Sequence, residues 1–511
     1  MKMYNSVICL LSEAARKYPE RTAVEDNKKS LTYAEYNSIS MGIGAYFIKA
    51  HNGCQQTEPI AVILPKSHRN LLLFMGILYS GNAYVPLDDK MPVARLTKIL
   101  ENLRPLYIVT NEAVMESLTV AGFDRGKMLL FEDVTGEAPD KDLVERRIGR
   151  VIDKDPVYIM YTSGSTGMPK GIAISHRSVF DYANWIVNTF NINEDSVFGS
   201  QAPFYFDNSV LDIYSCLLTG AKLVIIPDEL FQFPARLPEF IDKKRVDTIF
   251  WIPTVMINVA NSGALDDESL KLTHLKRVMF CGEPMPNKPL NVWRKRLPEV
   301  LFANLYGPTE ITDVCTYYIV DRDFKDSDPL PIGVPCKNTR ALILTDNNTE
   351  AKIDEIGELC ILGSSLALGY WRSPEITAKA FTDNPLNGNY SEKIYHTGDL
   401  VYMSEDGLIM FVGRKDSQIK HKGNRIELGE IETAIKGFNG IDNACVLYDQ
   451  LKQQIVLFIE TTDGSLSIRS INNQLIKHVP KYMLPGSLVA MEKLPYNANG
   501  KIDRVALKAT L

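Results

Sequence analysis

The segment YIMYTSGSTGMPKG (158–171) is the most informative part of the chain. Its apolar start predicts a buried strand that runs directly into small hydroxyl residues and glycines, which disfavours a mere flexible linker. Such a loop lets backbone N–H groups approach phosphate oxygens, and a lysine adds a point charge. It is not a Walker A loop, because Lys170 follows a proline and precedes no Ser or Thr. The predicted phosphate-binding residues are Thr162, Ser163, Gly164, Ser165, Thr166, Gly167 and Lys170.

Strand-like apolar runs alternate with helical patterns on both sides of this loop. PIAVILP (59–65), for example, precedes the helical NLLLFMGILYSG (70–81). The alternation predicts βαβ units around mostly parallel sheets, and after about residue 330 short runs with Gly and Asp turns indicate a small β-barrel-like segment. We therefore expect an α/β fold. It comprises a large N-terminal body, residues 1–415 with the β-rich segment at about 330–415, and a small mobile α+β C-terminal domain, residues 416–511.

Composition excludes several classes of function. The 511 residues carry a net charge of −6, so a nucleic-acid partner is not expected. No apolar run approaches the ~20 residues of a membrane span, and residues 10–15 repeat at helical spacing, which favours an amphipathic helix over a signal peptide. Eight scattered cysteines form no CxxC pair, which argues against a structural zinc site and a disulfide framework. These features predict a cytoplasmic protein without membrane insertion.

Further motifs follow in a characteristic order. They are NAYVPLD (82–88), APFYFDNSVLDIY (202–214), NLYGPTE (304–310), GELCILGSSLALGYW (357–371), YHTGDL (395–400), GRKDSQIKHKGNRIELGEIE (413–432) and NGKIDR (499–504). Together with YTSGSTGMPKG they resemble the adenylate-forming superfamily of acyl-CoA synthetases, luciferase and amino-acid adenylation domains. The resemblance covers nearly the whole chain, and it implies ATP and Mg²⁺ as cofactors.

The resemblance implies a nucleotide site. Tyr306 would stack on adenine and Glu310 would reach Mg²⁺, which suits a carboxylate because that cation prefers oxygen ligands. Asp399 and Arg414 would bind the ribose. The remaining residues implied at ATP are Gly282, Glu283, Pro284, Asn304, Gly307 and, at the α-phosphate, Thr309.

The C-terminal motifs imply a two-step mechanism. Lys501 would bridge the substrate carboxylate and the phosphate while two anions meet. Asp416 resembles the family hinge, about which the C-terminal domain exchanges Lys501 for the face carrying Gly423. Past Gly423 the phosphopantetheine arm of a carrier protein would enter. Since the chain stops soon after NGKIDR, we expect that carrier to act in trans.

Asp207 separates amino acids from other acids. FDNSV resembles the motif of amino-acid adenylation domains, in which the aspartate binds the α-ammonium group. The simpler interpretation is a cap on a helix that begins near Ser209. An acyl-CoA ligase, which typically lacks this aspartate, remains one alternative. An inactive scaffold is another, although the residues expected to bind ATP are intact.

The side-chain pocket favours a small amino acid. FDNSVLDIY and VMFCGEPMP resemble the ligases that load D-alanine onto a carrier protein, so D-alanine is the expected substrate. Asp313 departs from their pattern: it could pair with Asn208, point away, or meet a hydroxyl or ammonium group. The alternative is therefore a polar or cationic amino acid in a nonribosomal peptide-type pathway. The predicted substrate-binding residues are Asp207, Asn208, Leu211, Phe250, Met279, Cys281, Leu305, Asp313 and Val314.

Overall fold

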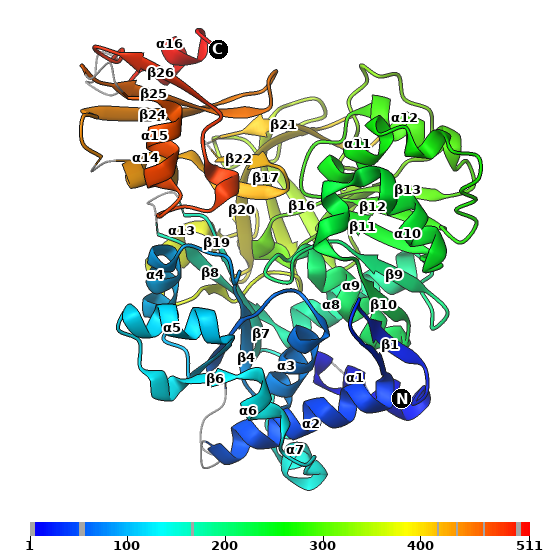
Figure 1. Cartoon of the computed structure of the whole chain (residues 1–511). Coiled ribbons are helices and arrows are strands. Elements are labelled where there is room, and N and C mark those ends of the chain that lie inside the picture. The colour runs from blue at the N-terminus through cyan, green and yellow to red at the C-terminus, as the bar shows by residue number, and fades with distance from the viewer. Residues whose placement is uncertain are drawn as a thin grey trace.

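The computed structural model describes residues 6–50, 57–164, 168–415, 418–435, 438–462, 466–496 and 502–511. Two large sheets with helices and a smaller half-barrel sheet form the body, and a compact C-terminal module lies at one end of it (Figure 1). This mixed α/β architecture confirms the predicted fold class. Among the described residues, no helix has the length and apolar character needed to cross a membrane.

The larger sheet is parallel from β13 to β1, with β2, β14 and β15 antiparallel at its edges. Its nine strands, in spatial order, are β15 (Val334–Pro335), β14 (Thr316–Ile319), β13 (Leu301–Tyr306), β12 (Arg277–Phe280), β11 (Thr248–Trp251), β9 (Val197–Ser200), β10 (Lys222–Ile225), β1 (Thr22–Glu25) and β2 (Ser30–Thr32).

The second sheet contains the strand that leads into the Ser/Gly loop. Its seven strands, in spatial order, are β18 (Gly369–Tyr370), β8 (Lys170–Ser175), β7 (Pro156–Thr162), β4 (Ala83–Pro86), β3 (Pro59–Ile63), β5 (Tyr107–Thr110) and β6 (Met128–Leu130). Every residue of β3 and β4 is buried, as continuous apolar runs in a parallel sheet require.

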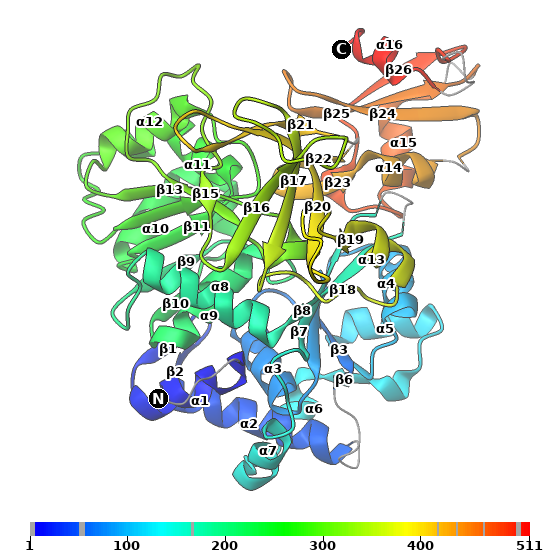
Figure 2. The ribbon, with the colours of Figure 1, turned by 180° about the vertical axis from the view of Figure 1, so that it is seen from behind.

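The half-barrel sheet is antiparallel. Its strands are β16 (Thr339–Leu344), β17 (Gly357–Gly363), β20 (Lys393–Met403) and β19 (Phe381–Asp383), with β21 (Ile409–Arg414) also paired to β20. Figure 2 shows this sheet from the other side, between the nine-stranded sheet and the C-terminal module.

Helices bury the faces of the large sheets. One continuous apolar cluster joins both sheets to α1 (Leu10–Lys17), α2 (Tyr33–Ala50), α3 (His68–Tyr79), α8 (His176–Thr189) and α9 (Asn208–Thr219). In α1 the residues at helical spacing form the buried face, as predicted. The outer helices are α4 (Val93–Leu103), α5 (Glu112–Val120), α6 (Phe131–Thr135), α7 (Lys141–Ile148), α10 (Leu237–Lys243), α11 (Pro253–Asn261), α12 (Asn287–Arg296) and α13 (Pro374–Ala380).

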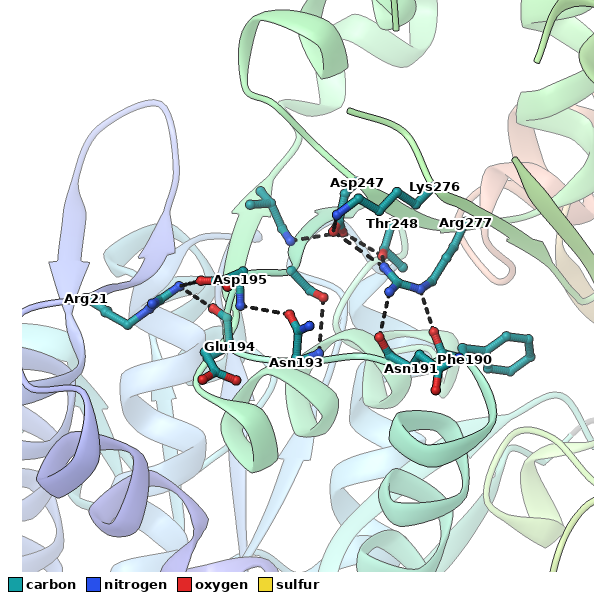
Figure 3. Close-up of polar contacts among 12 residues, drawn as sticks. Arg21, Phe190, Asn191, Asn193, Glu194, Asp195, Asp247, Thr248, Lys276 and Arg277 are labelled. Carbon is teal, nitrogen blue, oxygen red and sulfur yellow. Dashed lines mark hydrogen bonds and ion pairs between the residues drawn. The ribbon is translucent and has the colours of Figure 1, made fainter. Parts of the chain in front are cut away.

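A polar network fixes α8 to the strands beside it (Figure 3). The Arg277 guanidinium at the start of β12 donates to the Phe190 carbonyl at 2.5 Å and to Thr248 Oγ1 at 3.1 Å. It also lies 3.4 Å from Asp247, whose carboxylate accepts from the Val197 backbone N–H at 3.0 Å. The network therefore aligns β9, β11 and β12 at the end of the sheet where these strands begin.

The C-terminal module begins with a hairpin of β22 (Gln418–His421) and β23 (Asn424–Glu427). It continues with α14 (Leu428–Ile435), β24 (Asn443–Asp449), β25 (Gln454–Glu460), α15 (Ile468–Leu475), β26 (Ser487–Met491) and α16 (Arg504–Lys508). Glu430 of α14 forms an ion pair with Arg95 of α4, and both side chains are 5% exposed. The module is thus docked on the body through a buried contact.

Candidate active site

The predicted site residues converge on one cleft. It lies beyond the carboxyl ends of β12 and β13, where open parallel sheets bind ligands, and the hairpin borders it. The predicted residues that line it are Thr162, Ser163, Asp207, Asn208, Cys281, Gly282, Gly307, Thr309, Asp313, Asp399, Arg414 and Gly423. Residues widely separated along the chain therefore share one surface.

Asp207 is both a helix cap and a cleft residue. It precedes α9 and accepts from the Asn208 backbone N–H at 3.1 Å, so the simpler interpretation of a cap is also correct. Its carboxylate nevertheless faces the cleft. Burial raises the pKa of Asp207, and a hydrogen bond from Thr309 and the Lys420 ammonium act in the opposite direction. A cationic group in the cleft would favour the ionised carboxylate further.

The predicted side-chain pocket has an apolar wall. Phe250 of β11 and Met279 of β12 are register partners in adjacent parallel strands. The apolar residues predicted there belong to one buried cluster: Leu211, Phe250, Met279, Cys281, Leu305 and Val314. Of these, Cys281 contributes directly to the cleft surface. The other five are packed in the buried cluster and are not among the residues that line the cleft.

Asp313 adds a carboxylate to this wall. It lines the cleft and accepts from the hydroxyl of the buried Tyr182 at 2.6 Å. Asn208 does not donate to it. Thr312 and Asp313 both have positive φ angles, 61° and 73°, which side chains adopt at a conformational cost. Burial and the nearby Asp207 raise the pKa of Asp313 well above its usual value. Asn208 Nδ2 is buried without a hydrogen-bond partner among the described residues.

The ribose and adenine residues form a connected group. Asp399 of β20 and Arg414 of β21 are cross-strand partners, and the guanidinium donates to the carboxylate at 2.8 Å. The Tyr306 hydroxyl donates to the same carboxylate. Asn304 instead donates to the Pro331 carbonyl at 2.7 Å, and Pro284 is exposed and does not line the cleft. Of the residues implied near the base, Gly282 lines the cleft, whereas Glu283, Pro284, Asn304 and Tyr306 are not among the residues that line it.

The phosphate side of the cleft is in contact with the C-terminal module. Glu310, 1% exposed, receives two hydrogen bonds from Arg425, at 2.9 and 2.7 Å, and one from Tyr370 at 2.7 Å. Ser163 Oγ donates to the Arg425 carbonyl at 2.8 Å. Thr162 Oγ1 is buried with no partner in the described part of the chain, as expected of a group that awaits a ligand. Lys170 Nζ lies 5.6 Å from the centre of the Tyr370 ring.

Two glycines are required by close packing. A Cβ atom at Gly164 would lie 1.9 Å from the Met168 carbonyl oxygen. At Gly423, where φ is +75°, it would lie 2.7 Å from Ile252 Cδ1. The Gly423 N–H donates to Glu283 at 2.7 Å, so the hairpin turn is pressed against the cleft wall. In this arrangement Glu283 therefore accepts a hydrogen bond from the hairpin turn.

Five predicted residues lie outside the described residues: Ser165, Thr166, Gly167, Asp416 and Lys501. Next to Lys501 in the chain, Ile502 packs with Leu494 and Leu507 on the outer side of β24 and β25. Figure 1 shows α16 at the far end of the module from the large sheets. The hairpin, and not this end of the module, borders the cleft.

Sequence reasoning missed Arg425, Tyr370 and Tyr182. Arg425 and Glu310 are 115 residues apart, and Tyr182 and Asp313 are 131 apart. Arg425 stands inside the quoted GRKDSQIKHKGNRIELGEIE string and Tyr370 inside the quoted GELCILGSSLALGYW string, and these motifs were the available signals. Nothing in the local pattern distinguishes Tyr182 from an ordinary core residue.

Comparison with known proteins decides the family. The profile of the AMP-binding enzymes matches residues 11–371. The chain belongs to this family. The expectation of an adenylate-forming enzyme is thereby confirmed.

Similar proteins fall into two groups. Tyrocidine synthase 1 of Brevibacillus parabrevis is 30% identical over 98% of this chain. This chain spans 45% of the length of that protein. It spans less than half the length of other synthases that it matches. D-alanine–D-alanyl carrier protein ligase of Listeria monocytogenes serotype 4b is 33% identical over 99% of both chains. The structure of holo-PA1221, an NRPS protein containing adenylation and PCP domains, superposes with a TM-score of 0.83 at 24% identity, covering 99% of this chain and 84% of that one.

Proposed function

We propose that this enzyme uses ATP to convert a small amino acid into its aminoacyl-adenylate and then transfers the aminoacyl group to the phosphopantetheine thiol of a separate carrier protein. The observation that carries the proposal is the half-buried Asp207 carboxylate at the cleft, in a chain of the AMP-binding family. A carboxylate partly withdrawn from water beside an apolar wall is stabilised by a positive partner, and the α-ammonium group of an amino acid supplies one. An acyl acid would leave Asp207 without that partner.

The proposed reaction has two steps. In the first, a substrate carboxylate oxygen bonds to the α-phosphorus and pyrophosphate leaves, with Lys501 offsetting the repulsion between the anions. In the second, the carrier thiolate bonds to the carbonyl carbon and AMP leaves. Glu310, 1% exposed at the phosphate side, would hold Mg²⁺, which neutralises phosphate charge when bound.

We propose that the arrangement described here serves the second step. Arg425 holds Glu310 in a two-pronged ion pair, so this carboxylate would be free for Mg²⁺ only after the hairpin moves away. Gly423 lies on the cleft, and the phosphopantetheine arm would enter past it. Rotation about Asp416 would then exchange the hairpin for Lys501. Free thiols at six described cysteines, Cys216, Cys281, Cys315, Cys336, Cys360 and Cys445, and the use of ATP support a cytoplasmic setting.

D-alanine is the substrate that we propose first. The Listeria ligase that is named for D-alanine matches this chain end to end, which supports the same substrate. Phe250 and Met279, which the resemblance implies at the side-chain pocket, are bulky and buried, and this supports a short substrate side chain. Cys281 lies on the cleft wall, at the position predicted from the resemblance to such ligases.

A small hydroxylated amino acid is the second candidate. Asn208 Nδ2 is a buried donor without a partner among the described residues, and Asp313 is an acceptor on the same cleft. A hydroxyl group donates one hydrogen bond and accepts others, so a serine side chain would satisfy both groups. A methyl group would satisfy neither.

Amino-acid-dependent exchange of pyrophosphate into ATP tests these proposals. The panel contains both enantiomers of alanine and serine together with propionate, assayed with the wild type and with Asp313→Ala. We expect D-alanine to give the highest kcat/KM and propionate to give none. If the wild type prefers serine to D-alanine and Asp313→Ala does not, serine would replace D-alanine as the proposed substrate. Exchange supported equally well by propionate would refute amino-acid activation.

A further inference from the structure

A group of potential metal ligands lies on the half-barrel sheet, outside the cleft. Glu358 and Cys360 stand on one face of β17, and Cys360 is the cross-strand partner of His396 on β20. The three potential ligand atoms lie within 4.8 Å of one another. Cross-strand pairing therefore brings together potential metal ligands that no CxxC motif in the sequence indicates.

The separations suit a single small cation. Cys360 Sγ and Glu358 Oε2 each lie 3.4 Å from His396 Nδ1. Ligands bound to one tetrahedral Zn²⁺ at the usual sulfur, nitrogen and oxygen distances are about 3.4–3.6 Å apart. The side chains of His396 and Glu358 are 26% and 14% exposed, so water can reach the fourth position.

The surrounding hydrogen bonds orient the ligands. Thr382 Oγ1 lies 2.9 Å from His396 Nε2 and can accept from Nε2–H when an ion takes Nδ1. Such outer partners are typical of metal-binding histidines. Glu358 Oε1 is held by the Gly398 N–H at 3.1 Å, so Oε2 is left to face the group.

We propose that Glu358, Cys360 and His396 bind a borderline-soft divalent cation of the Zn²⁺ type. A thiolate, an imidazole and a carboxylate form a ligand set that such ions accept and that Mg²⁺ avoids. Binding forms a metal–sulfur bond and releases the thiol proton to solvent. The ion would join β17 to β20 shortly before Asp399 in the same strand.

The positive charge of Lys415 disfavours cation binding at this site, so a Lys415 variant provides a specific test. Its ammonium lies 3.5 Å from Glu358 Oε2, but it also contacts Asp346 at 2.9 Å and can remain there when an ion takes Glu358. Lys415→Gln removes a positive charge beside the metal position. It should therefore raise the affinity for the cation, which a purely structural role of these residues does not predict.

The experiment titrates Co²⁺ and then Zn²⁺ into the untagged, EDTA-treated full chain without ATP. We expect one equivalent of Co²⁺ to produce the thiolate-to-cobalt charge-transfer absorption, Zn²⁺ to displace it, and one proton to be released per ion. Cys360→Ser should lose the absorption, whereas Cys445→Ser, which removes an equally buried cysteine from β24, should keep it. His396→Gln should weaken binding about tenfold or more.

Two results would overturn the site. The first is a wild type that binds no ion with a thiolate signature, and the second is a signature that persists in folded Cys360→Ser. Circular dichroism checks the fold. If Cys360→Ser does not fold, His396→Gln decides the matter, because undiminished affinity in that variant would also exclude the site.

Discussion

Asp207 combines a helix cap with a place on the cleft, and only the second role concerns the substrate. We expect Asp207→Asn to raise the KM for the amino acid about ten- to a hundredfold, because a hydrogen bond to a charged group contributes about 1.5–3 kcal/mol. The KM for ATP should stay near that of the wild type. Steady-state pyrophosphate exchange, with each substrate varied in turn, measures both constants.

Asp212→Asn is the matched control for this variant. Asp212 is buried in the same helix α9 but does not line the cleft. Its replacement should leave the KM for the amino acid unchanged. Equal effects of the two variants would show that the loss comes from the helix and not from a contact with the ammonium group.

The role of a single residue can be predicted from the sequence when a local motif contains that residue, and not when the role depends on a contact with a distant part of the chain. Asp207 stands in a recognisable string and its position follows from that string. Tyr182 reaches Asp313 across 131 residues, so its hydroxyl was predictable only after α8 had been placed. The choice between alanine and serine depends on such long-range contacts, which explains why the motifs alone left it open.

Among the elements, the β22–β23 hairpin matters most for transfer. Gly423→Ala would bring a Cβ atom to 2.7 Å from Ile252 Cδ1 and push the turn away from the cleft. Because small displacements of reacting groups can cost on the order of a hundredfold in rate, we expect a loss of that size in aminoacyl transfer. Adenylate formation, which uses Lys501, should be little affected. Single-turnover transfer to a pantetheinylated carrier measures the first quantity and pyrophosphate exchange the second.

Gly407→Ala separates the two possible causes of such a loss. Gly407 has the same φ of +75°, but its Cβ would meet nothing within 4 Å. It therefore carries the backbone strain without the collision. A similar defect in Gly407→Ala would contradict the proposed role of the hairpin contact.

The strands that carry the pocket depend on the Arg277 network at their other end. Arg277→Met would leave the Asp247 carboxylate without a buried cation and two carbonyls after α8 without a donor. Breaking a buried pair in this way typically costs about 3–5 kcal/mol, which urea unfolding would detect. Arg322→Met removes an exposed pairing with Asp406 and serves as the control, with little expected effect. A loss below about 1 kcal/mol for Arg277→Met, as for a surface pair, would contradict this account.

The elements themselves were the most predictable part of the structure. A run such as that of β3 is apolar throughout because both faces of a parallel sheet are covered. The docking of the hairpin was not predictable, because it depends on Arg425 meeting Glu310 in a different part of the chain. Local periodicity contains no information about such a contact.

At the scale of the whole molecule, the proposed mechanism brings two faces of one module to one cleft in turn. The described arrangement places Gly423 and Arg425 at the cleft and α16 at the far end of the module. The buried Arg95–Glu430 contact belongs to this arrangement, so the proposed rotation would break it. The order of motifs along the chain suggested both faces, but it could not indicate which one the folded chain presents.

The rates of the two half-reactions in Lys501→Ala test the central claim most directly. We predict that adenylate formation falls about a hundred- to a thousandfold, because a transition-state contact to developing charge is lost. Transfer from preformed aminoacyl-adenylate to the carrier should remain near the wild-type rate. Lys508→Ala, at an exposed lysine of α16, should change neither step. An equal loss in both half-reactions of Lys501→Ala would contradict a rotating module that serves one cleft in two steps.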